Sequence, residues 1–154
     1  MKKPVRLSTA SLIITIAVNL LFIAIACISV YTLISIVIIA IPTNTFGLYY
    51  MPMSIQLKDK ALYVNSSLRC KRIPLDEVST AEIARPDNYI RIAASGGFMG
   101  YCGVFNSHEY DKYTAYYGNP KECFILRMKD GKKIMLGCKD HAEMVDAINK
   151  QLKG

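Results

Sequence analysis

Residues 12–41 decide the first part of the fold, and they read LIITIAVNLLFIAIACISVYTLISIVIIAI. These thirty residues include no charged side chain. A helix on the surface of a soluble protein needs a polar face, which this stretch lacks. About 20 apolar residues suffice to cross a bilayer as one helix. The stretch therefore predicts a membrane-anchored protein.

The apolar stretch is too long for one upright helix. At 1.5 Å per residue it would reach ~45 Å, whereas the hydrocarbon core of a bilayer is ~30 Å thick. Together with its uncharged neighbours the region extends over residues 10–50. This length favours two short spans, about 10–27 and 32–50, with a turn near 27–32. One long, strongly tilted span is the alternative.

Basic residues flank the apolar region on both sides. They are Lys2, Lys3 and Arg6 before it, and Lys58, Lys60, Arg69, Lys71 and Arg72 after it. The positive-inside rule keeps both flanks in the cytoplasm, which requires an even number of crossings. Tyr49 and Tyr50 suit the interface at the end of a second span. We therefore predict a transmembrane α-hairpin between a basic cytoplasmic segment, residues 1–9, and a cytoplasmic domain, residues 51–154.

A processed anchor is a second interpretation of the same region. A basic start followed by an apolar stretch resembles a secretory signal, and the AIAC sequence of residues 24–27 resembles a lipoprotein cleavage site. However, fourteen further uncharged residues follow Cys27. A second span accommodates them most simply.

The pattern changes after Met53 to short apolar and polar alternations separated by turn residues, which is typical of an antiparallel sheet. Asp59-Lys60 predicts a tight turn, and Asp130-Gly131 predicts a type I′ hairpin. We expect about seven short strands, and the eight candidate segments are residues 54–58, 61–64, 68–73, 80–84, 89–93, 113–117, 122–128 and 132–136.

The C-terminus changes to helical periodicity. Met144, Val145, Ile148 and Leu152 form one apolar stripe, and Asp140 with Glu143 three residues later resembles a capping box. We expect this helix to cap the open end of a curled sheet or barrel. The predicted fold class is thus a transmembrane α-hairpin followed by a mainly-β domain with one C-terminal helix.

Residues 50–154 resemble a bacterial pleckstrin-homology-like (PH-like) domain of the membrane-anchored type. The resemblance is carried by four segments: the chain exit at 50–52, the RIPLDEV turn at 72–78, the SGGFMGYCG loop at 95–103, and the DGKKI hairpin at 130–134 before the C-terminal helix. The resemblance implies a PH-like fold and association with the bacterial inner membrane. It implies no particular chemistry.

The same resemblance suggests a weak site for a lipid headgroup. PH domains that bind phosphoinositides use a lysine on the first strand and a basic pair with one residue between its members after it. Lys58 and the pair Arg69 and Lys71 resemble this set, although the pair falls on the third predicted strand. The alternation of a strand places Arg69 and Lys71 on one face, and a solvated face is the simpler interpretation.

The glycine-rich loop at 95–103 has three interpretations. Glycines allow a bulged, sharply bent strand pair. Alternatively, Phe98, Met99 and Tyr101 anchor the loop in the headgroups. A ligand site that includes Gly96, Gly97, Phe98 and Tyr101 is the third interpretation, although the loop lacks the standard phosphate-binding motifs.

No catalytic or metal-binding pattern stands out. Cys102, His108, Cys138 and His141 are the candidates, but zinc sites show paired ligands at short spacing on both sides, and one pair is missing here. Cys102 and His108 lack an orienting third group. We therefore predict no enzyme, no cofactor and no metal.

The charge pattern excludes a typical nucleic-acid binder. Residues 51–154 hold 16 Lys/Arg against 12 Asp/Glu, a net charge of +4 without a dense basic stripe. We expect the lipid bilayer as one partner, and either an unknown protein or a second copy of the chain as the other. The predicted function is a membrane-anchored interaction module, and the alternative is a lipid-headgroup-binding domain.

Overall fold

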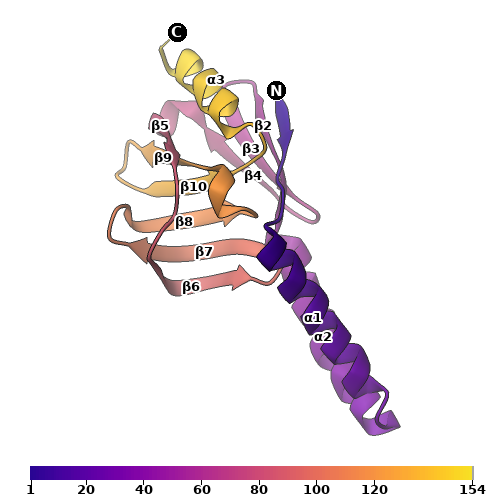
Figure 1. Cartoon of the computed structure of the whole chain (residues 1–154). Coiled ribbons are helices and arrows are strands. Elements are labelled where there is room, and N and C mark those ends of the chain that lie inside the picture. Colours follow the sequence, from indigo (N-terminus) through magenta and orange to yellow (C-terminus); the bar gives the residue numbers. More distant parts are fainter. Residues whose placement is uncertain (154) are drawn as a thin grey trace.

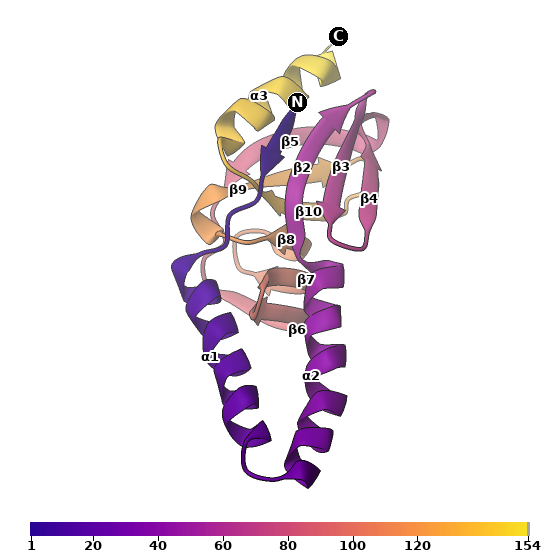
Figure 2. The same cartoon turned by 90° about the vertical axis from the view of Figure 1, so that its right-hand side faces the viewer.

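Two long helices protrude from a β-rich body in the computed structural model, which describes residues 1–153 (Figures 1 and 2). They are α1 (Thr9–Ala26) and α2 (Val30–Tyr50). Ser29 caps α2, because its Oγ accepts from Thr32 N at 3.2 Å while Thr32 Oγ1 accepts from Ser29 N at 2.9 Å. The chain therefore reverses between Ala26 and Val30. The α-hairpin is confirmed, and one continuous helix is excluded.

Both helices are long and apolar enough to cross a membrane. At 1.5 Å per residue their lengths are about 27 and 31 Å. Their polar side chains bond to the carbonyls of their own helix, since Asn19 Nδ2 donates to Thr15 O at 2.8 Å and Asn44 Nδ2 donates to Ala40 O at 3.0 Å. These bonds satisfy part of the hydrogen-bonding capacity of the side chains within the helix, which favours burial in lipid.

The first sheet contains four antiparallel strands in the order β1-β2-β3-β4. They are β1 (Lys2–Pro4), β2 (Pro52–Lys58), β3 (Ala61–Ser66) and β4 (Cys70–Pro74). The structure differs here from the division expected for residues 1–9, because Lys3 pairs with Ile55 and β1 is part of the domain. The sequence pattern did not indicate β1, because three residues are too few to show alternation. In the structure β1 covers the otherwise open edge of β2.

The second sheet contains six strands in the order β5-β9-β10-β8-β7-β6. They are β5 (Val78–Ala84), β6 (Tyr89–Gly97), β7 (Gly100–Ser107), β8 (Asp111–Tyr117), β9 (Cys123–Met128) and β10 (Lys133–Gly137). Within residues 1–153 the structure thus has ten strands rather than about seven. The glycine-rich segment expected as a loop forms the ends of β6 and β7, and β8 pairs with β10 in parallel, so the expected antiparallel order fails at that pair.

The turns show which local predictions were correct. Asp59 and Lys60 have φ values of 50° and 53°, so the tight turn between β2 and β3 is confirmed. The hairpin between β9 and β10 is confirmed as well, but not its turn type. Of Asp130 and Gly131 only Gly131 has a positive φ, 84°, whereas a type I′ turn needs two such residues.

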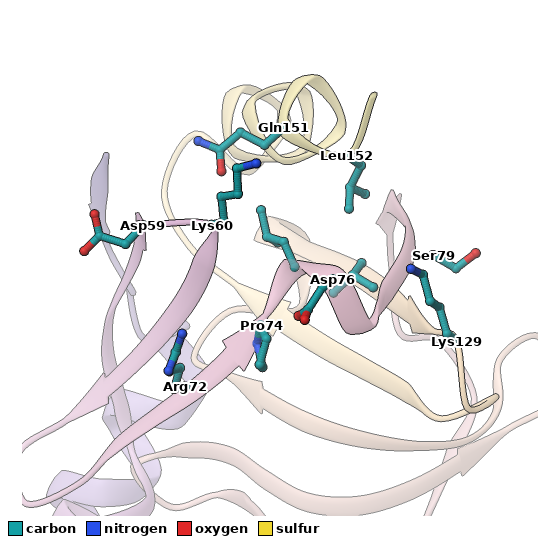
Figure 3. Close-up of a pocket in the computed structure, with 11 residues that line it drawn as sticks. Asp59, Lys60, Arg72, Pro74, Asp76, Ser79, Lys129, Gln151 and Leu152 are labelled. Carbon is teal, nitrogen blue, oxygen red and sulfur yellow. The ribbon is translucent and has the colours of Figure 1, made fainter. Parts of the chain in front are cut away.

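The helix α3 (His141–Lys153) covers the core between the two sheets. Of its predicted stripe, Met144 and Ile148 are fully inaccessible, Val145 is buried and Leu152 is partly buried. Its C-terminal end borders an open hollow together with the β2–β3 turn (Figure 3). The expected capping box is not formed: Asp140 has a φ of 54° instead of the extended backbone of an N-cap, and Lys3 Nζ binds the carboxylates of both Asp140 and Glu143.

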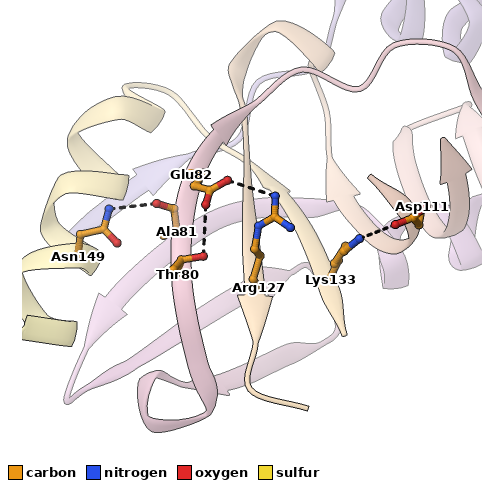
Figure 4. Close-up of polar contacts among 7 residues, drawn as sticks. All are labelled: Thr80, Ala81, Glu82, Asp111, Arg127, Lys133 and Asn149. Atoms are coloured by element: carbon orange, nitrogen blue, oxygen red, sulfur yellow. Dashed lines mark hydrogen bonds and ion pairs between the residues drawn. The ribbon is translucent and has the colours of Figure 1, made fainter. Parts of the chain in front are cut away.

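Polar contacts tie α3 and the strands of the second sheet together (Figure 4). Asn149 Nδ2 donates to Ala81 O of β5 at 3.0 Å. The ion pair of Arg127 with Glu82 links β9 to β5 at 3.4 Å. These contacts fix the edge of the sheet under the helix.

The second sheet curls around an aromatic core of its own. Four residues, 85–88, connect its opposite edges β5 and β6, so the sheet must bend strongly. Phe105, Tyr113 and Tyr117 fill the inside of this bend and are at most 1% exposed. This part of the domain lies on the side from which the α-hairpin leaves (Figure 1).

Candidate functional site

The turn between β6 and β7 is inserted between the two long helices. Met99 N donates to Thr15 Oγ1 of α1 at 2.9 Å. On the other side, a Cβ at the buried Gly47 of α2 would collide with Met99 Sδ. Thr15 is six residues into α1, so the Phe98–Met99 tip reaches about 9 Å along that helix. The domain is thereby locked to the hairpin.

Two basic side chains lie beside the last turn of α2. The Arg69 guanidinium is 5.8 Å from the centroid of the Tyr49 ring. Lys71 Nζ is 4.6 Å from the centroid of the Tyr116 ring and donates to the Tyr116 hydroxyl at 3.2 Å. Within residues 1–153 neither side chain forms an ion pair. Both cations therefore remain available to an anionic ligand.

A hollow of about 490 Å³ opens between the end of α2 and the strands β6 and β7. Its walls are mostly small or aromatic, and it is lined by Phe46, Tyr50, Ala93, Ala94, Ser95, Cys102 and Gly103. Tyr50 also lines a smaller hollow that contains Arg69 and Lys71. The apolar hollow and the basic pair thus share one wall, and we call them together the α2 groove.

Cys102 lines the α2 groove, and its surroundings shift the pKa of its thiol. Burial raises the pKa of its thiol to about 11, while the charges of Arg69 and Lys71 act in the opposite direction. The two cations are therefore close enough to act on a group inside the hollow. A thiol with this pKa stays protonated at neutral pH, which disfavours a role as nucleophile.

Lys58 lies at the other end of the domain. Its Nζ is 3.5 Å from Asp59, beside the turn that follows β2. The seven residues of β2 separate it from the end of α2 by about 20 Å. The structure therefore brings Arg69 and Lys71 together but not Lys58, so the three-residue set expected from the sequence is divided.

The hollow at that far end measures about 600 Å³ (Figure 3). Its charged lining is mixed, since Lys60, Arg72 and Lys129 face the same space as Asp59 and Asp76. These carboxylates compensate the cations. The hollow is thus electrostatically less suited to an anion than the α2 groove.

The glycine-rich segment forms a bent strand pair with a two-residue turn. Gly97 pairs with Gly100, and its φ of +102° favours glycine. Gly96 lies against Tyr101, whose ring stacks on Tyr117 at 4.8 Å. Tyr101 thus faces the aromatic core, whereas Phe98 lies at the tip next to α2. Insertion of this tip into headgroups remains a prediction, as does ligand binding at these residues.

Neither metal binding nor catalysis gains support from the side-chain arrangement. Among residues 1–153, no group of three His, Cys, Asp or Glu side chains is placed to hold a metal ion. Cys138 is buried, and burial raises the pKa of its thiol to about 12. A metal ligand would have to be a thiolate, which this burial disfavours.

A comparison with known protein families identifies the family of the chain. Residues 53–152, well over half of the sequence, match the bacterial PH domain family. The chain belongs to this family. No curated protein and no solved structure matches the sequence significantly. The PH domain thus extends from β2 to α3, and the α-hairpin and β1 lie outside the matched residues.

Proposed function

We propose that this PH protein is a membrane-anchored, non-enzymatic interaction module. Its two helices cross the bacterial inner membrane as a hairpin and hold the PH domain at the cytoplasmic surface. There the domain binds a partner protein or a second copy of the chain. The pairing of β1 with β2 is the observation that carries the proposal.

This pairing joins the two ends of the hairpin. β1 precedes α1 and β2 follows α2, yet Lys3 pairs with Ile55, and the Met1 amine donates to Leu57 O at 2.7 Å. Two segments of one sheet lie on the same side of a membrane, so the helices cross it twice. Residues 1–50 contain three basic and no acidic residues, which favours the cytoplasmic side.

The strand β6 supports binding to a protein. It forms one edge of the second sheet, and its Ile90 and Ile92 side chains are 71% and 57% exposed. Edge strands present unpaired backbone groups to which another chain can add. A bound protein would cover both these groups and the isoleucines.

Photo-crosslinking in intact cells tests the binding. A photoreactive amino acid at position 90 should yield a heavier crosslinked species, because Ile90 lies on the proposed surface. The matched control carries the same amino acid at the exposed position 121, which is outside β6. Identical products at both positions, or none at position 90, would contradict the proposal.

A second function is supported by one specific observation. Arg69 and Lys71 form no ion pair within the described part of the chain, and both lie near Tyr49 at the end of α2. Tyrosines at helix ends commonly occupy the membrane interface, where anionic headgroups are. We therefore also propose that the domain binds lipid headgroups.

A further inference from the structure

The shape of the α2 groove suits the upper part of a lipid rather than a headgroup alone. It is lined by the small residues Ala93, Ala94 and Gly103 of β6 and β7 and by the rings of Phe46 and Tyr50 of α2. Gly103 lies directly against β6, because a Cβ at this position would collide with the Ala93 carbonyl of that strand. This part of the α2 groove is thus a mainly apolar channel.

The charge of the α2 groove is positive on one side only. Arg69 is exposed and Lys71 half-buried, and both border the hollow that shares Tyr50 with the channel. None of the described residues that line the two hollows is acidic. Arginine and lysine are the side chains that bind phosphate best, the first through its planar fork and the second as a point charge.

The position of the groove identifies the source of its ligand. It opens beside Phe46, Tyr49 and Tyr50, where α2 enters the domain, and the Phe98–Met99 tip borders the same region. If the helices span the membrane, this is the level of the headgroups. A lipid of the surrounding bilayer reaches the groove there without leaving its leaflet.

We propose that the α2 groove binds an anionic glycerophospholipid of the bilayer. Arg69 and Lys71 contact the phosphate, and the glycerol and the first part of one acyl chain lie between α2 and the strands β6 and β7. This inference rests on the proposed membrane hairpin. It adds a defined site and a ligand class to the general affinity for headgroups.

Photo-crosslinking with lipids tests the site. The full-length protein is placed in nanodiscs that contain phosphatidylglycerol with a diazirine near the top of the acyl chain. Parallel samples contain phosphatidylcholine with the same label. Mass spectrometry locates the crosslinks, and we expect adducts on residues 93–103 with phosphatidylglycerol in excess over phosphatidylcholine.

The double variant Arg69→Gln/Lys71→Gln should lose this excess. Each basic side chain near an anionic surface contributes about fivefold in affinity, so the preference should fall about 25-fold. The control Lys58→Gln/Lys60→Gln removes the same charge from the far end and should keep the preference. Equal labelling by both lipids, or an unchanged preference in the first variant, would overturn the proposal.

Crosslinks on the helices separate the two proposals. Adducts on α1 and α2 with both lipids report that the hairpin is inserted. Their presence without adducts on residues 93–103 would overturn the lipid site alone, whereas their absence would overturn the membrane hairpin itself. The variant Ala93→Trp, which fills the exposed side of the channel, should abolish the adducts on 93–103 but keep those on the helices.

Discussion

The reactivity of Cys102 follows from its place in the α2 groove. Burial raises the pKa of the thiol to about 11. At pH 8 about one such thiol in 1,000 is ionised, against about one in ten for a thiol with a pKa near 9. Since the thiolate is the nucleophile, Cys102 should react about 100-fold more slowly than an exposed thiol.

Alkylation followed over pH measures this directly. The Cys27→Ser protein is treated with iodoacetamide between pH 7 and pH 10, and the peptides with Cys70 and Cys102 are quantified separately by mass spectrometry. Cys70 is exposed and serves as the internal reference. For Cys102 the rate should rise about tenfold per pH unit over the whole range, because every pH used lies below its pKa.

Removal of the neighbouring charges should slow the reaction further. Arg69 and Lys71 lower the pKa of Cys102, so Arg69→Gln/Lys71→Gln raises it and leaves less thiolate at each pH. The far-end variant Lys58→Gln/Lys60→Gln should change nothing. A rate for Cys102 that levels off near pH 9, or one equal to that of Cys70, would refute the account of burial in the groove.

Two further substitutions test the packing. The Tyr117 hydroxyl is buried without a hydrogen-bond partner among the described residues, so Tyr117→Phe should raise the free energy of unfolding by about 1 kcal/mol in denaturant melts. Gly47→Leu should lower the free energy of unfolding by about 1–3 kcal/mol, since the new side chain collides with Met99. It should also weaken the contact between the hairpin and the domain. Hydrogen exchange of the β6–β7 turn should accelerate.

Matched variants control for both effects. Tyr116→Phe removes a hydroxyl that accepts from Lys71, so it should destabilise the domain, and a similar loss in Tyr117→Phe would contradict the prediction. Thr45→Leu changes an exposed position of the same helix as Gly47. If it accelerates exchange at the turn as much as Gly47→Leu does, the turn is not held by the fit at Gly47.

The sequence predicts those parts of the fold that local patterns encode. Hydropathy and length identified the hairpin, and the stripe of Met144 and Ile148 identified the C-terminal helix. The strand β1 could not be found in this way, because Lys2 to Pro4 pair with residues fifty or more positions away. Asp140 shows the same limit, since Lys3 of that distant strand binds the carboxylate expected to cap the helix.

The candidate site was only partly predictable for a similar reason. Arg69 and Lys71 line one hollow although β4 begins only at Cys70, so strand alternation is not what brings them together. Spacing along the chain does not show that β2 carries Lys58 away from them. The aromatic lining of the groove depends on the path of α2 into the domain, which brings Tyr50 and Cys102 to the same hollow. No sequence motif marks that hollow, because its lining residues come from a helix and two strands that are distant in the sequence.

The side of the membrane on which each end lies tests the central claim most directly. A protease-cleavable tag is placed before residue 1 in one strain and after residue 154 in another, and cleavage by external protease is measured in spheroplasts. The pairing of β1 with β2 predicts that both tags are protected until the membrane is opened. Cleavage of one tag alone would place the ends on opposite sides and contradict the hairpin. Cleavage of both would contradict the cytoplasmic position of the PH domain.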